Sequence, residues 1–407
     1  MKKICILLQN QYDSDIRVRR KAEALIEAGY SVDVLALRSA ANTKEYTLGD
    51  VRVFTVGLGK KRGSLARYSF EYAAFFIWAF WKLFWLMSGQ DYDAIDVNNL
   101  PDFLVFAAAY AKWRGAKVVF DMHEITPEFY VSKYGIGENS WVTRWLKWIE
   151  RRSFKFADHV ITINEPIQKL LESRGLQRSN STVVMNAADE AMFEAARTTP
   201  AVERRPGFVM MYHGTLTQIY GLDIALEAFG RARPKMPGAE FWILGKGPEQ
   251  ARLMEQAQRL GLNGSVKFLG TVPPEKIPGW LSQCDAGVLA TRRDVFLDYS
   301  FSNKLSEYVV MGKPVISSRL KTIASYFSDQ ALAYFEPNNA EQLAREMVRV
   351  YGDAALRTRL ARQAAQEYAP ISWGVMKERY LAMMAELLGG SARPQIAEPP
   401  ATTVGAV

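Results

Sequence analysis

The chain has 407 residues, a formal net charge of +8 and 49% hydrophobic residues. This length and balance exclude a fibrous or wholly disordered protein and allow two or more domains, each with its own core. The positive charges form none of the Lys/Arg repeats that bind nucleic acid. We therefore expect acidic small molecules or an anionic membrane surface as partners, and no nucleic acid.

The cysteines and histidines argue against a disulfide or metal framework. Cys5 and Cys284 lie in or beside apolar stretches, and His123, His159 and His213 are too far apart for a local metal motif. The N-terminal apolar run is too short for a secretory signal and is soon followed by charges. These features predict a cytoplasmic protein without a bound metal.

The first elements predict the start of a parallel sheet. An apolar strand at 3–8 is followed by an amphipathic helix at 16–28 and a second strand at 31–37. The loop 9–15 follows the carboxyl end of the first strand, where open parallel sheets bind ligands. We expect Asp15, in this loop, to cap the helix, with a substrate contact as the second possibility.

The segment 68–87, YSFEYAAFFIWAFWKLFWLM, is unusually aromatic. Glu71 and Lys82 interrupt it and leave too short an uncharged run to cross a bilayer, which takes about 20 residues. Two interpretations stay open: a helix buried beside the sheet, or an interfacial helix that docks on anionic lipid through residues 60–87. The second rests on the basic residues that come first, Lys60, Lys61, Arg62 and Arg67.

A third apolar strand at 117–121 leads into His123 and Glu124. Because the carboxyl ends of parallel strands share one edge of a sheet, both side chains are expected beside the loop 9–15. A packed, hydrogen-bonded histidine is the alternative, but its place in a strand-end loop favours a substrate role for His123. Further along the chain we expect a strand at 158–163, a helix up to residue 174 and a linker at 194–206.

A second run of alternating strands and helices begins at residue 207. Strands at 208–213, 240–244 and 266–269 each lead into a turn rich in glycine or proline. This alternation is typical of a doubly wound α/β domain.

The predicted fold is therefore α/β, with two Rossmann-like doubly wound domains facing a cleft. The first domain spans residues 1–195 and the second 207–370. An amphipathic helix at 372–388 follows, and the Pro/Ala/Thr-rich tail at 391–407 is predicted to be disordered.

The stretch 301–318, FSNKLSEYVVMGKPVISS, predicts a polar loop, a short helix that begins near the cap-type residues Ser302 and Asn303, and a strand. The unpaired N–H groups and partial positive charge of a helix N-terminus suit a diphosphate, and Lys304 adds a full charge there. Glu307, one turn further on, can accept hydrogen bonds from a sugar diol. An ordinary strand–helix–strand crossover with a surface lysine is the alternative.

Eight short motifs occur in order along the chain. The N-terminal half carries DIRVRRKAEALIEAGYSVDVLAL, DMHEITPE, ADHVITINE and VVMNAAD, and the C-terminal half carries YHGTL, ILGKGPE, VKFLGTV and SNKLSEYVVMGKPVISS. With this order and spacing, residues 1–388 resemble the GT-B glycosyltransferases, and among them the retaining family 4 (glycosyl transferases group 1). The helix at 372–388 resembles the segment that crosses back onto the N-terminal domain in that family.

The resemblance implies a hexosyltransferase that moves a sugar from a UDP- or GDP-linked donor to a saccharide or a polyprenyl-diphosphate-linked acceptor. It also implies retention of configuration, no metal or other cofactor, and a role in cell-surface polysaccharide or glycolipid synthesis. The two Asp-x-Asp sequences, Asp13–Asp15 and Asp91–Asp93, lie in a loop and at a strand start and are not read as metal motifs. With the basic, aromatic segment 60–87, we expect a cytoplasmic protein that is peripheral on the inner face of the cell membrane.

The resemblance assigns roles to individual residues. His123, Lys304 and Glu307 are expected to be catalytic. The acceptor side is expected to consist of Asp15, His123 and Glu124. The expected donor-binding residues are Gly214, Thr215, Gly245, Lys246, Gly247, Val272, Ile277, Arg292, Ser302, Asn303, Lys304 and Glu307.

Two positions depart from the family pattern. Tyr299, with Asp298 beside it, stands where the first glutamate of the family's E-x7-E motif is expected. Ile219 and Tyr220 stand where basic residues often follow the GTL turn. Residues that could supply the missing positive charge are Lys246, Arg292, Arg293 and Lys304.

Two alternatives remain. A nucleotide-sugar epimerase of the same fold needs no acceptor surface, so the aromatic segment 68–87 argues against it. A non-catalytic, membrane-docked relative would explain Tyr299, but Lys304 and Glu307 argue against the loss of catalysis.

Overall fold

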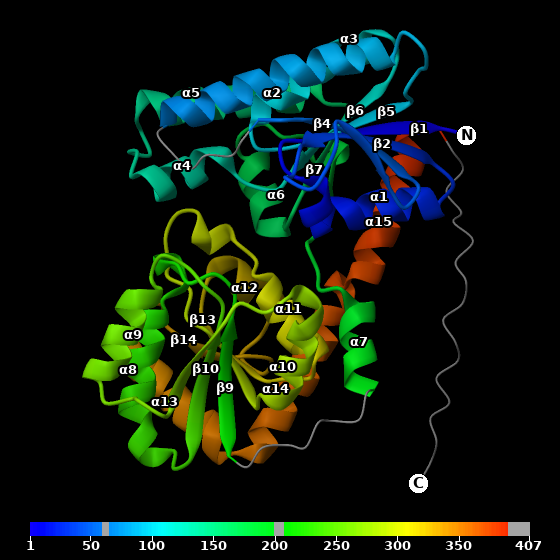
Figure 1. The fold of residues 1–407 in the computed structure, drawn as a ribbon. Coiled ribbons are helices and arrows are strands. Elements are labelled where there is room, and N and C mark those ends of the chain that lie inside the picture. Colours follow the sequence, from blue (N-terminus) through cyan, green and yellow to red (C-terminus); the bar gives the residue numbers. More distant parts are fainter. Residues whose placement is uncertain (59–64, 199–206, 390–407) are drawn as a thin grey trace.

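The computed structural model describes residues 1–58, 65–198 and 207–389 and shows two α/β domains, one above the other (Figure 1). Each domain is built on one sheet, and helices cover the sheets, as the alternation of strands and helices predicts. The prediction of two Rossmann-like, doubly wound domains is confirmed.

The first sheet has the strand order β3-β4-β2-β1-β5-β6-β7-β8, and its pairs are parallel except for the hairpin of β3 and β4. This hairpin is absent from the sequence predictions. The strands are β1 (Lys3–Leu8), β2 (Ser31–Leu37), β3 (Glu45–Leu48), β4 (Val51–Val56), β5 (Ala94–Asn98), β6 (Lys117–Met122), β7 (His159–Thr162) and β8 (Ser181–Val183).

Alternate residues of β1 explain how this sheet is covered. Cys5 and Leu7 belong to one buried cluster, and Ile4 and Ile6 to another, because successive side chains of a strand point to opposite faces. The first cluster includes residues of α2 (Leu65–Leu86), α3 (Ala109–Trp113), α5 (Trp141–Phe156) and α6 (Glu165–Glu172), and of the 3-10 helix Asp102–Ala108. The second includes residues of α1 (Ile16–Glu27) and α15 (Trp373–Leu387).

The second sheet has six strands within the described residues, all parallel, in the order β11-β10-β9-β12-β13-β14. The strands are β9 (Phe208–His213), β10 (Ala239–Leu244), β11 (Val266–Gly270), β12 (Ala286–Leu289), β13 (Val315–Ser318) and β14 (Ala333–Phe335). The helices are α8 (Leu222–Ala232), α9 (Gln250–Arg259), α10 (Ile277–Gln283), α11 (Asn303–Val310), α12 (Lys321–Tyr326), α13 (Ala340–Gly352) and α14 (Ala354–Tyr368).

The strand order reverses near the middle of both sheets. β1 lies between β2 and β5, and β9 lies between β10 and β12. A crevice opens at the carboxyl ends of the strands where the order reverses, and this is where doubly wound folds bind ligands.

The last helix, α15, returns from the second domain to the first (Figure 1). The Tyr380 hydroxyl donates a hydrogen bond to Asp96 Oδ2 at 2.9 Å, in the middle of β5. Arg379 Nη1 donates to the carbonyl of Val183 at 3.2 Å, and Lys377 pairs with Glu27 on α1. The helix thus completes the core beneath the first sheet.

Helix α2 is buried on one side and exposed on the other. Phe75, Ala79 and Leu83 are buried against the sheet, while Ile77 and Trp81 on the opposite side are exposed. No helix in the part of the chain that the structure describes has the length and apolar character needed to cross a membrane. The basic residues 60–62 lie outside the described residues, and the lipid contact through residues 60–87 stays a prediction.

The expected linker at 194–206 is wrong in its first part. Residues 190–198 form α7 (Glu190–Thr198), and Phe193 on this helix is buried. The helices α4 (Thr126–Tyr134) and α5 are also absent from the sequence predictions. The predicted disordered tail at 391–407 lies outside the described residues.

Candidate functional site

The N-terminus of α11 forms one wall of the site. Ser302 occupies the cap position in an extended conformation, but its side chain makes no capping hydrogen bond, contrary to the expectation for a cap-type residue. Without a side-chain cap, N–H groups of the first turn stay available to a ligand. The Lys304 ammonium lies beside them, 4.1 Å from the centre of the Tyr220 ring.

A cavity of about 420 Å³, here called the donor cavity, lies between α11 and the carboxyl ends of β9 and β10. It brings together residues that are far apart in the sequence, because strand ends of one parallel sheet converge on one edge. The predicted donor residues that line it are Gly214, Thr215, Gly245, Lys246, Val272, Ile277, Asn303, Lys304 and Glu307.

Two glycines allow the turns under the donor cavity to pack closely. A Cβ atom on Gly245, whose φ is +136°, would lie 1.9 Å from the carbonyl oxygen of Gly214. A Cβ atom on Gly247 would lie 2.1 Å from the carbonyl oxygen of Leu216. Gly247 does not line the cavity, so the structure shows its close packing, while its donor contact stays a prediction.

Glu307 is held by a histidine that the sequence analysis did not assign to the site. Glu307 Oε2 lies 2.5 Å from His213 Nε2, and His213 Nδ1 lies 3.1 Å from the hydroxyl of Tyr308. The Tyr308 hydroxyl in turn donates to the carbonyl of Met211 on β9. The position of His213 at the end of a buried strand, directly before the GTL turn, was the signal that could have found it.

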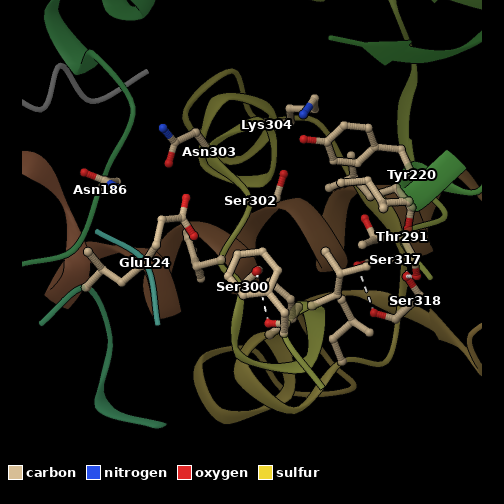
Figure 2. A pocket seen from close by; sticks show the side chains of 18 of the residues that line it. Glu124, Asn186, Tyr220, Thr291, Ser300, Ser302, Asn303, Lys304, Ser317 and Ser318 are labelled. Carbon is tan, nitrogen blue, oxygen red and sulfur yellow. Dashed lines mark hydrogen bonds between the residues drawn. The ribbon is translucent and has the colours of Figure 1, made fainter. Parts of the chain in front are cut away.

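A second cavity of about 400 Å³, here called the cleft cavity, is lined by both domains (Figure 2). Arg17, His123 and Glu124 reach it from the first domain, and Asn303 and Lys304 from the second. Since Asn303 and Lys304 also line the donor cavity, the two cavities meet at the start of α11. A donor molecule bound there would present its transferred group to the first domain.

The buried ring of His123 has one nitrogen committed to protein partners. Nε2 lies 2.7 Å from Asn98 Oδ1 and 3.3 Å from Asp121 Oδ2. Burial lowers the pKa of the ring, although Asp121 opposes this shift, so the neutral form is favoured at pH 7. Two acceptors at Nε2 fix its proton there, and Nδ1, which has no protein partner within the described residues, remains an acceptor.

Glu124 is a carboxyl group with altered acidity in the cleft. Burial raises its pKa to about 7, while Arg17 and Lys133 oppose the shift. Its side chain and that of Asn303 face each other across the cleft in Figure 2. Glu124 therefore changes its charge within the physiological pH range.

Asp15 has a different role from the two that its sequence position predicts. Its side chain makes no capping hydrogen bond and does not line the cleft cavity. Instead it accepts two hydrogen bonds from Arg17, at 3.1 and 2.9 Å. Burial disfavours the charged form of Asp15, but the Arg17 bonds prevail and lower its pKa to about 2. Asp15 thus orients Arg17, a cleft residue that the sequence analysis missed.

Two family models match the chain and cover both domains. "Glycosyl transferase 4-like domain" matches residues 15–187, and "Glycosyl transferases group 1" matches residues 207–353. The chain belongs to the GT-B glycosyltransferases. Its prediction as an enzyme of this class is confirmed, and the first family model agrees with family 4.

Relatives and solved structures agree with the family. The lipopolysaccharide core biosynthesis glycosyltransferase LpsE of Rhizobium meliloti is 26% identical over 216 residues, which are 53% of this chain and 58% of the relative. The chain spans about half the length of the curated relatives it matches.

Two solved structures share the fold at low sequence identity. Sucrose-phosphate synthase from Thermosynechococcus elongatus matches with a TM-score of 0.73 and 16% identity, covering 96% of this chain and 100% of that one. HepE of Anabaena, solved in complex with UDP, matches with a TM-score of 0.65 and 19% identity, covering 96% and 100%.

Two basic residues that were candidates for the donor site, Arg292 and Arg293, instead form contacts outside both cavities. Arg292 donates to Asp223 at 2.6 Å and to Asn338 at 3.0 Å, and it lines neither cavity. Arg293 contacts Asp298 at 3.3 Å and lies equally outside both cavities. Arg292 therefore ties the loop after β12 to the start of α8, and its donor-binding role stays a prediction that these contacts do not support.

Tyr299 does not replace the missing family glutamate in the site of this glycosyltransferase. Its hydroxyl accepts a hydrogen bond from Lys321 at 2.9 Å, and its carbonyl accepts one from Asn164 at 2.9 Å. Tyr299 and Asp298 are absent from the linings of both cavities, whereas Ser300 lines the cleft cavity. Tyr299 therefore takes no part in the wall of either cavity.

Proposed function

We propose that this glycosyltransferase transfers a hexosyl group from a UDP- or GDP-linked sugar to a saccharide or a polyprenyl-diphosphate-linked saccharide. The carrying observation is that the donor cavity, with Lys304 and Glu307, opens at Asn303 into a cleft lined by His123 and Glu124. The UDP bound in the HepE structure supports a uridine donor. The name of LpsE supports a role in cell-surface polysaccharide or glycolipid synthesis.

Departure of the nucleoside diphosphate is the demanding step. Negative charge builds on the leaving phosphate as the bond to the anomeric carbon breaks. The N-terminus of α11, Lys304 and Lys246 stabilise this charge, without a metal ion in our proposal. Glu307 holds the ribose diol, and His213 keeps its carboxylate in place.

The first domain positions the reacting sugar and the acceptor. In the proposed complex, Nδ1 of neutral His123 accepts a hydrogen bond from a hydroxyl of the transferred sugar, and Glu124 and Arg17 contact the acceptor. We propose that the leaving phosphate takes the proton of the acceptor hydroxyl as the new bond forms on the same face, which retains the anomeric configuration. Both substrates are then held in one cleft, which gives the entropic advantage of proximity.

One assay separates this function from its alternatives. The protein is incubated with a panel of nucleotide sugars, with and without a polyprenyl-diphosphate saccharide, and free nucleoside diphosphate is quantified. A transferase releases it with the acceptor, an epimerase converts the nucleotide sugar without release, and a non-catalytic relative does neither. The anomeric proton coupling of the product, measured by NMR, tests retention.

We also propose a cytoplasmic, peripheral location on the inner face of the membrane, through residues 60–87. The exposed aromatic side of α2 supports it, since such a face suits the boundary between lipid and water. Reversing the charges of Lys60, Lys61, Arg62 and Arg67 to Glu should reduce co-sedimentation with anionic vesicles. Arg67→Glu should also lower thermal stability, because Arg67 pairs with the buried Glu71 at 3.1 Å. Equal sedimentation of variant and parent would contradict a contact through these residues.

A further inference from the structure

Helix α5 exposes three tryptophans on one side. Trp141, Trp145 and Trp148 are 73%, 51% and 52% exposed. Their spacing of four and three residues places them within an arc of about 60° on a helix with 3.6 residues per turn. Large apolar side chains gathered in this way on a soluble surface mark a contact with another molecule.

The core does not need these tryptophans. The opposite side of α5 is buried through Leu146, Ile149, Ser153 and Phe154, and it packs beside the 3-10 helix Asp102–Ala108 on the face of the first sheet opposite α15. Ser140 caps the helix by accepting a hydrogen bond from the N–H of Thr143. The fold of α5 is thus complete without its exposed side.

The exposed side of α5 is also positively charged. Arg144, Arg152 and Lys155 are exposed near the tryptophans, and the Arg152 guanidinium lies 5.2 Å from the Trp148 ring centre. The one acidic residue of the helix, Glu150, is buried and pairs with Arg174 at 3.4 Å. The outward face therefore combines indole rings with cations and carries no compensating negative charge from its own helix.

Helix α2 offers a second apolar ridge on the same side of the sheet. Both α2 and α5 pack against the 3-10 helix Asp102–Ala108, and both lie on the outer face of the upper domain in Figure 1. Phe70, Ile77, Trp81 and Trp85 are the large exposed apolar residues of α2. The two helices together present aromatic rings and cations over one face of the first domain.

We infer that the outward face of α5, formed by Trp141, Trp145 and Trp148 with Arg144, Arg152 and Lys155, docks on the surface of an anionic phospholipid bilayer. Indole rings settle at the level of the headgroups, and the cations bind lipid phosphates. A second copy of the chain is a poor occupant, because two such faces would bring like charges together. The inference rests on the proposed peripheral location, and it moves the main contact from residues 60–87 to α5.

Helix α4 connects this docking face with the cleft. Helix α4 follows directly after Glu124, packs on α5, and touches the second domain through Ser132, which donates to Asp294 at 2.6 Å. Lys133 on α4 also lies 5.1 Å from the ring centre of Tyr68 on α2. A saccharide carried on a membrane lipid would then reach the cleft along α4 while its lipid stays in the bilayer.

Two variants of α5 test the inference against a matched control. The first carries Trp141→Ser, Trp145→Ser and Trp148→Ser. The second carries Arg144→Glu, Arg152→Glu and Lys155→Glu. The control makes the same change of charge at exposed arginines of the second domain, with Arg345→Glu, Arg359→Glu and Arg362→Glu.

The full-length proteins are sedimented with vesicles of phosphatidylglycerol and phosphatidylcholine, or of phosphatidylcholine alone, at low and high salt. We expect both α5 variants to partition more weakly than the parent into the anionic vesicles, by on the order of 10²-fold for the charge variant. The control should bind like the parent, and high salt should release the parent. Thermal unfolding and donor hydrolysis without lipid should be unchanged in all variants, because α5 lines neither cavity.

Each other outcome has a definite meaning. If the α5 variants bind like the parent while the variant at residues 60–67 does not, the α5 contact is wrong and the membrane location stands. If the parent binds no vesicles, or binds neutral ones equally well at high salt, the anionic bilayer is the wrong occupant. A parent that dimerises through α5 in light scattering would overturn the inference in favour of a second copy. Donor hydrolysis, measured separately, reports on the glycosyltransferase function.

Discussion

The donor cavity and the first-domain wall of the cleft are built in different ways. The donor cavity consists of two glycine turns, the segment 271–277 after β11 and the start of α11, each formed by residues that are close in sequence. The opposite wall depends on long-range polar pairs, such as the contact of Lys21 with Asp121 beneath His123. The difference teaches that short motifs can encode the proposed donor site, whereas the charged contacts beneath His123 depend on residues far apart in the sequence.

The largest effect is expected on the donor side, at Glu307. Glu307→Gln keeps the size of the side chain but removes the charge that meets His213 Nε2 at 2.5 Å. We expect turnover to fall on the order of 10³-fold and nucleoside diphosphate binding to weaken, with unchanged thermal stability. Calorimetry with the nucleoside diphosphate checks the binding, and parental affinity would remove Glu307 from the donor site.

Lys304→Ala should lower turnover by on the order of 10²-fold, the usual cost of removing a group that stabilises developing charge. Arg292→Ala is the matched control, because Arg292 binds Asp223 outside both cavities. Its turnover should stay close to that of the parent in steady-state kinetics. A loss as large as that of Lys304→Ala would restore the donor role of Arg292.

Asp15→Asn tests the opposite wall, where it leaves Arg17 without its carboxylate partner. We expect about a tenfold rise in the KM for the acceptor and an unchanged KM for the donor, since Arg17 lines the cleft cavity and not the donor cavity. Equal changes in both constants would show that Asp15 supports the fold in general.

The same substitution has a signature in stability. The pKa of Asp15 is lowered from 3.8 to about 2, so its ion pair stabilises the fold above about pH 4 and is lost as the pH falls through about 2. Asp15→Asn should therefore cost roughly 2 kcal/mol at pH 7 and little near pH 2. Denaturant unfolding at the two pH values checks this difference.

The smallest expected effect is the pH dependence of acceptor turnover that Glu124 confers. Its pKa of about 7 predicts that kcat/KM for the acceptor rises several-fold from about pH 6 to 8, as the carboxylate forms and accepts a hydrogen bond from the acceptor. Glu124→Gln should abolish this inflection in the pH profile. A profile with the same midpoint in the variant would assign the titration to another group.

Stability gives a second readout for Glu124. A pKa raised from 4.5 to about 7 means that the folded protein binds this proton more tightly than the unfolded chain does. Its contribution to stability therefore falls as the pH rises from about 4.5 to about 7. Glu124→Gln should lose less thermal stability than the parent over that range.

Much of the donor side was predictable because its signals are local. The run from Ser302 to Glu307 predicts a helix start, and Gly214 and Gly245 mark turns at strand ends. Which basic side chains face the cavity was not predictable in the same way. Arg292 and Lys304 both follow a strand or loop in the sequence, and only the tertiary position of Asp223 shows that Arg292 forms an ion pair.

The first domain shows the opposite balance. The ion pair of Asp15 and Arg17 has no sequence signal that separates it from a helix cap, and the hairpin of β3 and β4 lies at the sheet edge with weak apolar alternation. Helix α5 was missed although it had a sequence signal: its apolar residues recur at helical spacing, and Ser140 stands at its start. The exposure of its tryptophans could not be predicted, because Trp and Leu residues at helical spacing are as consistent with a buried helix face as with an exposed one.

The return of α15 to the first domain affects how the protein is made. Tyr380 reaches Asp96 in the centre of the first sheet, so the core of this domain stays open until the last helix has left the ribosome. Roughly 190 residues separate the end of β8 from the start of α15, which takes on the order of ten seconds or more to synthesise. During that time the second domain can finish folding. The second domain, although synthesised later, is therefore complete before the first domain.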